Sequence, residues 1–167
     1  KLKSTLPNMV IVLGLITALT SLLLAYVFTV TEEPINIAKQ QKLNNAIAEV
    51  VPGLTSFNES TVACTDGDLT FYDALDENGK SIGTAVKSFD NNGFNGTVVI
   101  MVGFDTIGNV IKTIPLEQKE TPGLGDKMDV KKSDFTQQFD GVNTRNFIFK
   151  VKKDKGDVDA ITAATIS

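Results

Sequence analysis

Two short stretches of this 167-residue chain combine residue types that could do chemistry. The first, "ETPGLG" at 120–125, places two glycines around Leu124. Thr121 precedes a proline and is therefore biased towards an extended conformation, whereas Gly123 and Gly125 can adopt positive φ and let a flat ligand approach the backbone. Successive N–H groups in such a loop could meet a carbonyl or phosphate oxygen. An ordinary turn is the alternative interpretation of the same residues.

The second stretch, "DAITAATIS" at 159–167, sets the hydroxyl groups of Thr162, Thr165 and Ser167 among small residues. It follows a run of charge, "KVKKDKGD". Its side chains are too weakly hydrophobic for a core strand and include few strong helix formers. On composition alone, the simplest interpretation is a solvated tail.

The composition of the chain excludes several kinds of chemistry. There is no histidine, so histidine acid–base catalysis, histidine–metal sites and Ser–His triads are excluded within this chain. The single cysteine, Cys64, cannot form an internal disulfide or supply four thiolates to an iron–sulfur cluster. We interpret Cys64 as a buried structural thiol, with a site completed by a partner subunit as the alternative. An electron carrier held by this chain alone would be organic.

Residues 9–30 carry no charge and predict a membrane-spanning helix. At ~1.5 Å per residue, 22 residues of helix are about 33 Å long, enough to cross a hydrocarbon core of ~30 Å. The alternatives are a buried core helix and a cleavable signal peptide. The run is long for a signal peptide, and no clear small-x-small cleavage site follows it. We therefore expect residues 9–30 to lie in the lipid bilayer.

The flanks of this run predict its orientation. Lys1 and Lys3 precede it, whereas Glu32 and Glu33 follow it. The positive-inside rule then places the N-terminus in the cytoplasm and everything after residue 31 on the outer, periplasmic side of the cell inner or plasma membrane. Without the two N-terminal lysines the chain has 14 basic and 20 acidic residues, a net charge of −6. An acidic domain argues against a nucleic-acid partner.

Residues 31–53 predict a juxtamembrane amphipathic helix that Pro52-Gly53 ends. Thr31 suits the N-cap and Pro34 the first turn. Apolar residues then recur at three- and four-residue steps, as expected for one face of a helix; they are Ile35, Ala38, Leu43, Ala46, Ile47 and Val50.

Residues 54–167 predict an outer domain built from strands and hairpins. Two similar turns centre on Asn78-Gly79 and Gly108-Asn109, within a shared D-x-x-G-x-x-I pattern at 76–82 and 105–111. The spacing is not that of an EF-hand calcium loop. We expect a short helix from Ser133, with Phe135 and Phe139 on its buried side, and a further strand at 147–152. The fold class is α+β: one transmembrane helix (1–30 with its N-terminal segment), then an antiparallel sheet with flanking helices.

Taken together, "ETPGLGDK" and "DAITAATIS" resemble the FMN-binding domain family, which includes the G subunit of the Rnf complex and the C subunit of Na⁺-translocating NADH:quinone reductase. The resemblance covers nearly the whole chain, and the "DK" after the loop is closer to the Rnf branch. In this family a flavin transferase recognises a tail of the form D-x-x-[S/T]-[G/A]-A-[T/S]-x-[S/T] and joins FMN to it by a phosphoester. The matching residues are Asp159, Thr162, Ala163, Ala164, Thr165 and Ser167.

The resemblance implies that Thr165 bears the covalent FMN, and that Thr162 and Ser167 belong to the recognition motif. Thr162-Ala163 stands where Ser-Gly is more usual. The "ETPGLG" loop is implied to hold the flavin, with Glu120, Thr121, Gly123, Leu124 and Gly125 as its neighbours. Backbone N–H groups or a nearby lysine would stabilise the phosphate; the candidates are Lys150, Lys152, Lys153 and Lys155.

The function implied by the resemblance is electron transfer. The chain would be a non-autonomous subunit of a translocase that oxidises ferredoxin, reduces NAD⁺ and pumps ions, with other membrane and peripheral subunits as partners. No catalytic or metal-binding residue of its own is expected. The alternatives are the covalent-FMN subunit of the quinone reductase or a related membrane flavoprotein and, from a different class, a flavin-free membrane-anchored scaffold. Family members usually continue beyond the tail motif, so we expect this sequence to be part of a longer chain.

Overall fold

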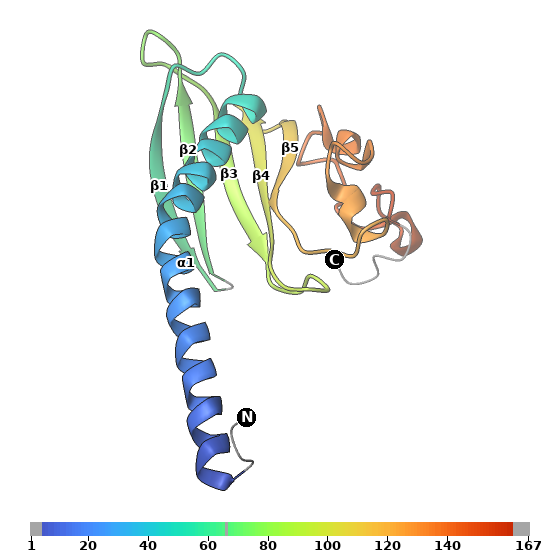
Figure 1. Ribbon diagram of the computed structural model, residues 1–167. Helices are drawn as coiled ribbons and strands as arrows, with labels where there is room; N and C mark the ends of the chain where they lie inside the picture. Colours follow the sequence, from blue (N-terminus) through green and yellow to red (C-terminus); the bar gives the residue numbers. More distant parts are fainter. Residues whose placement is uncertain (1–4, 66, 162–167) are drawn as a thin grey trace. The chain divides into compact units, whose positions relative to one another are not determined.

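The computed structural model describes residues 5–65 and 67–161. A long helix, α1 (Leu6–Val50), precedes a five-stranded sheet, and three short 3-10 helices follow the sheet (Figure 1). The strands are β1 (Ser56–Cys64), β2 (Gly67–Leu75), β3 (Ser81–Asp90), β4 (Val98–Asp105) and β5 (Val110–Glu117). The 3-10 helices are η1 (Gly125–Met128), η2 (Phe135–Phe139) and η3 (Lys152–Asp154). The predicted α+β class with an antiparallel sheet is confirmed.

Helix α1 contains the charge-free run. Within the described residues it is the one helix that is long and apolar enough to cross a membrane, with a mean hydropathy of 2.5 in its most apolar window. None of that window is buried by the rest of the protein. A core helix of a soluble protein would be largely covered, so this exposure argues against the alternative of a buried core helix.

The expected start of a second helix at Thr31 is wrong, because α1 continues through this position to Val50. The Thr31 hydroxyl donates to the carbonyl oxygen of Val27 (2.8 Å) in the preceding turn, so it does not cap a new helix. Threonine inside a helix often makes this bond. Pro34 also lies inside α1. Ile35 and Ala38, expected on a buried face, are exposed.

Contacts divide the chain into two compact units, one ending at Gln41 and the other beginning at Lys42. In the second unit the last two turns of α1 pack on the sheet through Leu43, Ala46, Ile47 and Val50, which recur at helical spacing. Ile47 and Val50 are completely buried. A Cβ atom on Gly103 would lie 2.1 Å from the Val50 carbonyl oxygen, so a glycine is needed where the helix meets β4. The sheet contributes Tyr72, Ala74, Ala85, Met101, Ile114 and Leu116 to this core.

The sheet is a meander in the order β1-β2-β3-β4-β5 (Figure 1). Both expected hairpin turns are confirmed. In each, an aspartate (Asp76 or Asp105) accepts through one carboxylate oxygen the N–H groups two and four residues later, at 2.8–2.9 Å. The following glycine, Gly79 or Gly108, adopts positive φ (74° and 88°). The carboxylates are therefore turn-forming acceptors, and the described residues contain no cluster that could hold a metal ion.

Strand β1 forms one edge of the sheet and is exposed along most of its length. Its one half-buried side chain, Phe57, packs edge-on against Tyr72 with ring centroids 5.5 Å apart. Cys64 ends the strand with an exposed side chain. The expectation of a buried structural thiol is therefore wrong: the thiol is exposed at the end of an edge strand.

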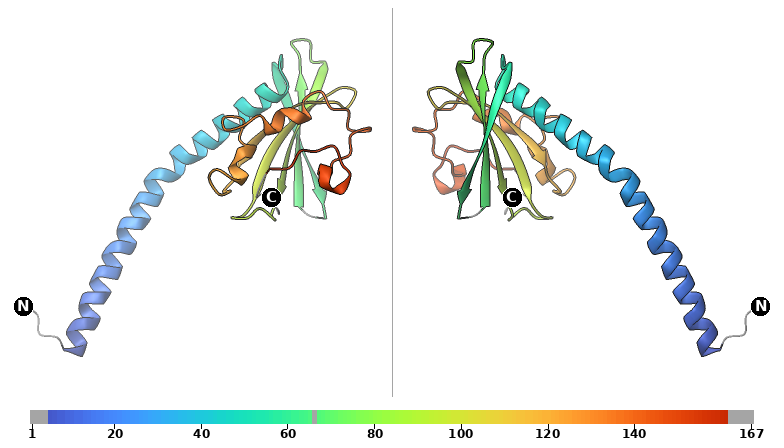
Figure 2. Two further views of the ribbon diagram at one scale, coloured as in Figure 1. Left: turned by 90° about the vertical axis from the view of Figure 1, so that its right-hand side faces the viewer. Right: turned by 90° about the vertical axis from the view of Figure 1, so that its left-hand side faces the viewer.

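The segment after β5 packs beside the β5 end of the sheet, chiefly through η2 (Figures 1 and 2). The short helix expected from Ser133 is present as this 3-10 helix, and the Ser133 hydroxyl accepts the Phe135 N–H (3.2 Å). The rings of Phe135 and Phe139 meet edge-on at 5.8 Å, and a second contact joins Phe139 to Phe147 at 6.3 Å. The two rings contact each other as one cluster, but both are only half-buried, and the buried residue of η2 is Thr136.

The strand expected at 147–152 is wrong. Residues 148–158 instead form a loop closed by backbone bonds from Asp157 to Ile148 (3.1 Å) and from Val158 to Lys150 (3.0 Å). Lys155 adopts a left-handed conformation, φ 61°, which reverses the chain. A Cβ atom on Gly156 would lie 1.9 Å from the Lys150 carbonyl oxygen, so the loop closes only on a glycine. The charged run is therefore a folded loop.

Candidate functional site

The 120–125 loop begins with a tight turn. The Thr121 carbonyl accepts the N–H of Leu124 (3.1 Å), and the two central residues are Pro122 and Gly123, with φ 81° at Gly123. Proline in the second position and a glycine of positive φ in the third are the residues of a type II turn. The positive φ expected at Gly123 is confirmed. Pro122, Gly123 and Leu124 are exposed, so the tip of the turn faces outward.

A buried carboxylate braces this turn from inside. Asp126 is only 4 % exposed; its Oδ1 accepts the Gly123 N–H (2.7 Å), and its Oδ2 forms an ion pair with the Lys132 Nζ (2.6 Å). The Lys132 hydrogen bond lowers the pKa of Asp126 below its ordinary value; burial opposes this, and the Gly123 N–H reinforces it. Sequence reasoning missed Asp126, although an aspartate directly after a glycine-rich turn often accepts a backbone N–H.

A second buried carboxylate, Glu120, joins two loops. Its Oε1 accepts the backbone N–H of Phe94 (2.9 Å), in the loop between β3 and β4, and the residue is 8 % exposed. A Cβ atom on Gly93 would lie 3.1 Å from Oε1, and one on Gly125 would lie 2.5 Å from Oε2. Gly125 is thus required for the close approach of Glu120, and not for a positive φ. Phe94 itself is exposed.

The expected row of free N–H groups is only partly present. The N–H groups of Gly123 and Leu124 are taken by Asp126 and by the Thr121 carbonyl, as described above. This part of the expectation is wrong, because a type II turn and its supporting aspartate consume both donors. Within residues 5–65 and 67–161 the N–H of Gly125 makes no hydrogen bond, but Gly125 is buried against Glu120, so the loop presents no exposed row of donors.

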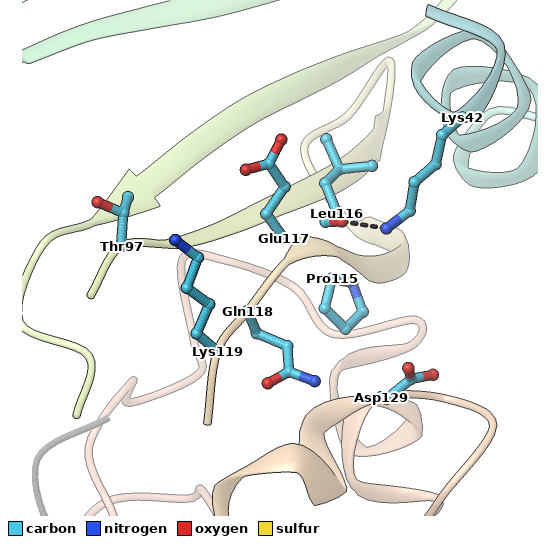
Figure 3. A pocket seen from close by; sticks show the side chains of 8 residues that line it. All are labelled: Lys42, Thr97, Pro115, Leu116, Glu117, Gln118, Lys119 and Asp129. Carbon is cyan, nitrogen blue, oxygen red and sulfur yellow. Dashed lines mark hydrogen bonds between the residues drawn. The ribbon is translucent and has the colours of Figure 1, made fainter. Parts of the chain in front are cut away.

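Two pockets involve residues next in sequence to this site, Lys119 for one and Asn92 for the other, and each is within the ~300–1,000 Å³ range of small-molecule sites. The first, of about 470 Å³, is polar (Figure 3). Its lining is Lys42, Thr97, Pro115, Leu116, Glu117, Gln118, Lys119 and Asp129. In it the Lys42 ammonium donates to the Leu116 carbonyl, while Lys119 directly precedes Glu120. The second, of about 570 Å³, lies at the end of the β3–β4 hairpin; its lining is Ser88, Phe89, Asp90, Asn91, Asn92, Val98 and Ile100.

The tail motif is described only at its start. Asp159 is held by Gln138 of η2 and by an ion pair with the Lys152 Nζ (2.7 Å). Lys152, one of the candidate phosphate ligands, is therefore paired with the first residue of the motif. The other predicted tail residues lie outside the described residues; they are Thr162, Ala163, Ala164, Thr165 and Ser167. The structure brings the loop and Asp159 onto adjoining elements, since η1 packs against η2.

Comparison with known proteins defines the class. Residues 93–167 match the model of the FMN-binding domain, a range that includes β4, β5, the braced loop and the tail. Proteins named as the G subunit of an ion-translocating oxidoreductase complex are similar over nearly the whole chain. The one from Vibrio vulnificus is 33% identical over 93% of this chain and 79% of its own length. Those from Shewanella piezotolerans and Shewanella baltica are 33% and 34% identical; they cover 99% and 93% of this chain, and 83% and 79% of their own lengths. The chain belongs to this G-subunit family.

Proposed function

We propose that this chain is the electron-transfer subunit of a membrane-bound, ion-translocating ferredoxin:NAD⁺ oxidoreductase of the Rnf type, and that it carries FMN covalently on Thr165. The observation that carries the proposal is the FMN-binding domain match at 93–167, which contains both the braced "ETPGLG" loop and the tail motif. The G-subunit relatives favour this complex over the related quinone reductase. The chain acts as part of an enzyme and not as an enzyme alone.

The charges around the loop suit an anionic cofactor. Asp126 is neutralised by Lys132 and by the Gly123 N–H, and the Glu120 carboxylate accepts the Phe94 N–H. Asp126 is therefore paired with a cation, whereas Glu120 has a hydrogen bond and no ion pair among the described residues. The exposed Lys119 side chain at the polar pocket is available to an oxygen acceptor. Bound FMN would supply reversible electron uptake and release, and the chain's own residues hold and orient it.

Attachment at Thr165 requires an activated flavin donor. The Thr165 hydroxyl loses its proton and its oxygen forms a bond to phosphorus, while the phosphoanhydride bond of a flavin dinucleotide breaks and releases a nucleoside monophosphate. A flavin transferase catalyses this exchange, in which no electrons are transferred. In the sequence, the neighbours Ala163 and Ala164 have small side chains, which suits access of a transferase to Thr165.

The proposal puts the FMN domain on the periplasmic side; the positive-inside rule supports this, since the lysines precede the span and the glutamates follow it. Outside the cytoplasm a released cofactor would be diluted away, so a covalent tether keeps one flavin on each subunit. The partners are the neighbouring redox subunits of the complex and, during maturation, the transferase.

The mass of the intact full-length chain, made in cells that contain the transferase, tests the proposal. We expect one FMN phosphoester on the wild type and none on Thr165→Ala, with matching loss of ultraviolet fluorescence in a denaturing gel. Ser167→Ala is the matched control and should still acquire the flavin. Retained covalent flavin on Thr165→Ala overturns the attachment site. A wild type with no flavin overturns the whole proposal and favours the scaffold.

A further inference from the structure

Every polar group of Asp159, the first residue of the tail motif, makes a hydrogen bond or an ion pair. The Asp159 N–H donates to Oε1 of Gln138 (2.6 Å), and the Asp159 carbonyl accepts from Nε2 of the same amide (3.4 Å). The two Asp159 carboxylate oxygens accept from the Lys152 Nζ, at 2.7 and 2.8 Å. Gln138 lies 21 residues earlier in the chain, so this contact fixes the tail to a distant element.

Gln138 is well placed for this contact. Its Nε2 also donates to the Phe135 carbonyl (2.8 Å) of the same 3-10 helix, which orients the amide. The side chain is half-buried, and η2 packs on β5. A carboxamide offers one acceptor and one donor side by side, which matches the N–H and C=O of a single residue. The neighbouring Gln137 is exposed and its side chain bonds to Asp134 (2.8 Å).

The ion pair is the weaker half of the contact. The side chains of Lys152 and Asp159 are 61% and 66% exposed, and pairs this exposed contribute little in water. The backbone of Asp159 is therefore held mainly by Gln138, whereas Lys152 occupies the carboxylate. That carboxylate is not free for a second protein to bind without displacing Lys152.

We propose that Gln138 is a positioning residue for flavin attachment: with Lys152 it docks Asp159 on the chain's own domain and so presents Thr165 to the transferase. The inference rests on the proposed attachment at Thr165. In this proposal Asp159 contacts Gln138 and Lys152 of its own domain, and the transferase binds the segment that follows Asp159. Thr165 follows Asp159 by six residues in the sequence.

The test is the rate of FMN incorporation into the full-length chain in detergent, with a purified flavin transferase and FAD. Gln138→Met keeps the length of the side chain and removes both bonds. We expect its kcat/KM for flavin attachment to fall about five- to tenfold, through a higher KM for the chain. This is the effect of losing the net free energy of about one typical hydrogen bond, since the second bond to Asp159 is long. Gln137→Met is the matched control and should be modified at the wild-type rate. In hydrogen exchange, Gln138→Met should lose protection at the Asp159 N–H, whereas Gln137→Met should keep it.

An exchange of charges separates docking from direct recognition. Lys152→Asp and Asp159→Lys should each slow attachment, because each places two like charges against each other. The double variant should recover much of the rate, because this repulsion is removed. A double variant as slow as Asp159→Lys alone means that the transferase reads the carboxylate itself, and it overturns the proposal. If Gln138→Met keeps the wild-type KM and the wild-type protection of the Asp159 N–H, the positioning role of Gln138 is overturned, whereas the proposed function stands. A wild type that acquires no FMN instead removes the proposed function.

Discussion

Glu120 and Gly125 approach so closely that a Cβ atom on Gly125 would lie 2.5 Å from the Glu120 Oε2 and 2.9 Å from its Cβ and Cγ. The space beside Gly125, where the sequence suggested that a ligand could approach, is thus occupied by the Glu120 side chain. Because Glu120 also accepts the Phe94 N–H, this contact keeps the 120–125 loop against the loop between β3 and β4.

Gly125→Ala should lower the free energy of unfolding by about 1–3 kcal/mol, the usual cost of forcing an extra methyl group into a packed site. Urea denaturation of the detergent-solubilised chain measures it. In a Glu120→Ala background the same substitution should cost less, since most of the clashing atoms are gone. Equal costs in the two backgrounds would mean that the two residues are not in contact.

Asp126 should make the domain sensitive to acid. Its pKa is lowered in the folded protein by the Lys132 hydrogen bond first, against the opposing effect of burial. A lowered carboxyl pKa stabilises the fold fully above the unfolded value of ~3.9, and this stability is lost as the pH falls through the folded pKa. Asp126→Asn should therefore flatten part of the fall in unfolding free energy between about pH 5 and pH 2.5.

The lowered pKa values of Asp76 and Asp105 act in the same pH window, so some acid sensitivity will remain in Asp126→Asn. Lys132→Met is the matched variant: it removes the main cause of the shift and should flatten the same part of the curve. Acid sensitivity equal to that of the wild type in both variants would contradict the role assigned to this pair.

The two aspartate turns should differ in their contribution to stability. Asp105 accepts a third bond, from the Asn109 side-chain amide (2.8 Å), and the Asn109 side-chain oxygen in turn accepts from the Asn143 amide (2.7 Å). The Asp76 carboxylate accepts the two backbone bonds of its turn. Asp105→Ala should therefore lower the urea midpoint more than Asp76→Ala. Asn143→Ala should reproduce part of the Asp105→Ala loss, and equal midpoints for the two aspartate variants would refute the difference.

The single cysteine reports the orientation of the chain. Cys64 is exposed and lies after the span, so a membrane-impermeant maleimide should label it in right-side-out vesicles and not in sealed inside-out vesicles. Detergent should make both labelled, and Cys64→Ser is the control for background. Labelling only in inside-out vesicles would place the domain in the cytoplasm and reverse the proposed topology.

Local signals explain which parts of the fold could be predicted. The uncharged run of 22 residues and the D-x-x-G turns each act over a few neighbouring residues, so composition and spacing suffice to find them. The strand expected at 147–152 failed because "NFIFKV" has apolar residues in a β-like order, whereas the conformation of Lys155 and the close approach of Gly156 to Lys150 turn the chain back. Helix α1 passes Thr31 because a threonine hydroxyl can bond to its own helix as well as cap one.

The sequence identifies many residues of the site, but it does not identify the contacts that these residues make. The glycines, Glu120 and Asp159 stand out in the sequence. Of their partners, Asp126 has a local signal, its place after a glycine-rich turn, whereas Phe94 and Gln138 are not marked by any spacing rule. Gly123 has the positive φ expected, whereas the reason for Gly125 is the side chain of Glu120. Long-range partners such as Phe94 and Gln138 require the tertiary fold.

Helix α1 has a practical consequence for any soluble fragment. Its charge-free part suits lipid, whereas Ala46, Ile47 and Val50 complete the core over Tyr72, Ala85 and Met101. A fragment that starts at Gly53 would leave this apolar surface of the sheet open to water and should aggregate. One that starts near Ile35 removes the membrane-spanning residues and keeps every helical side chain that the core uses.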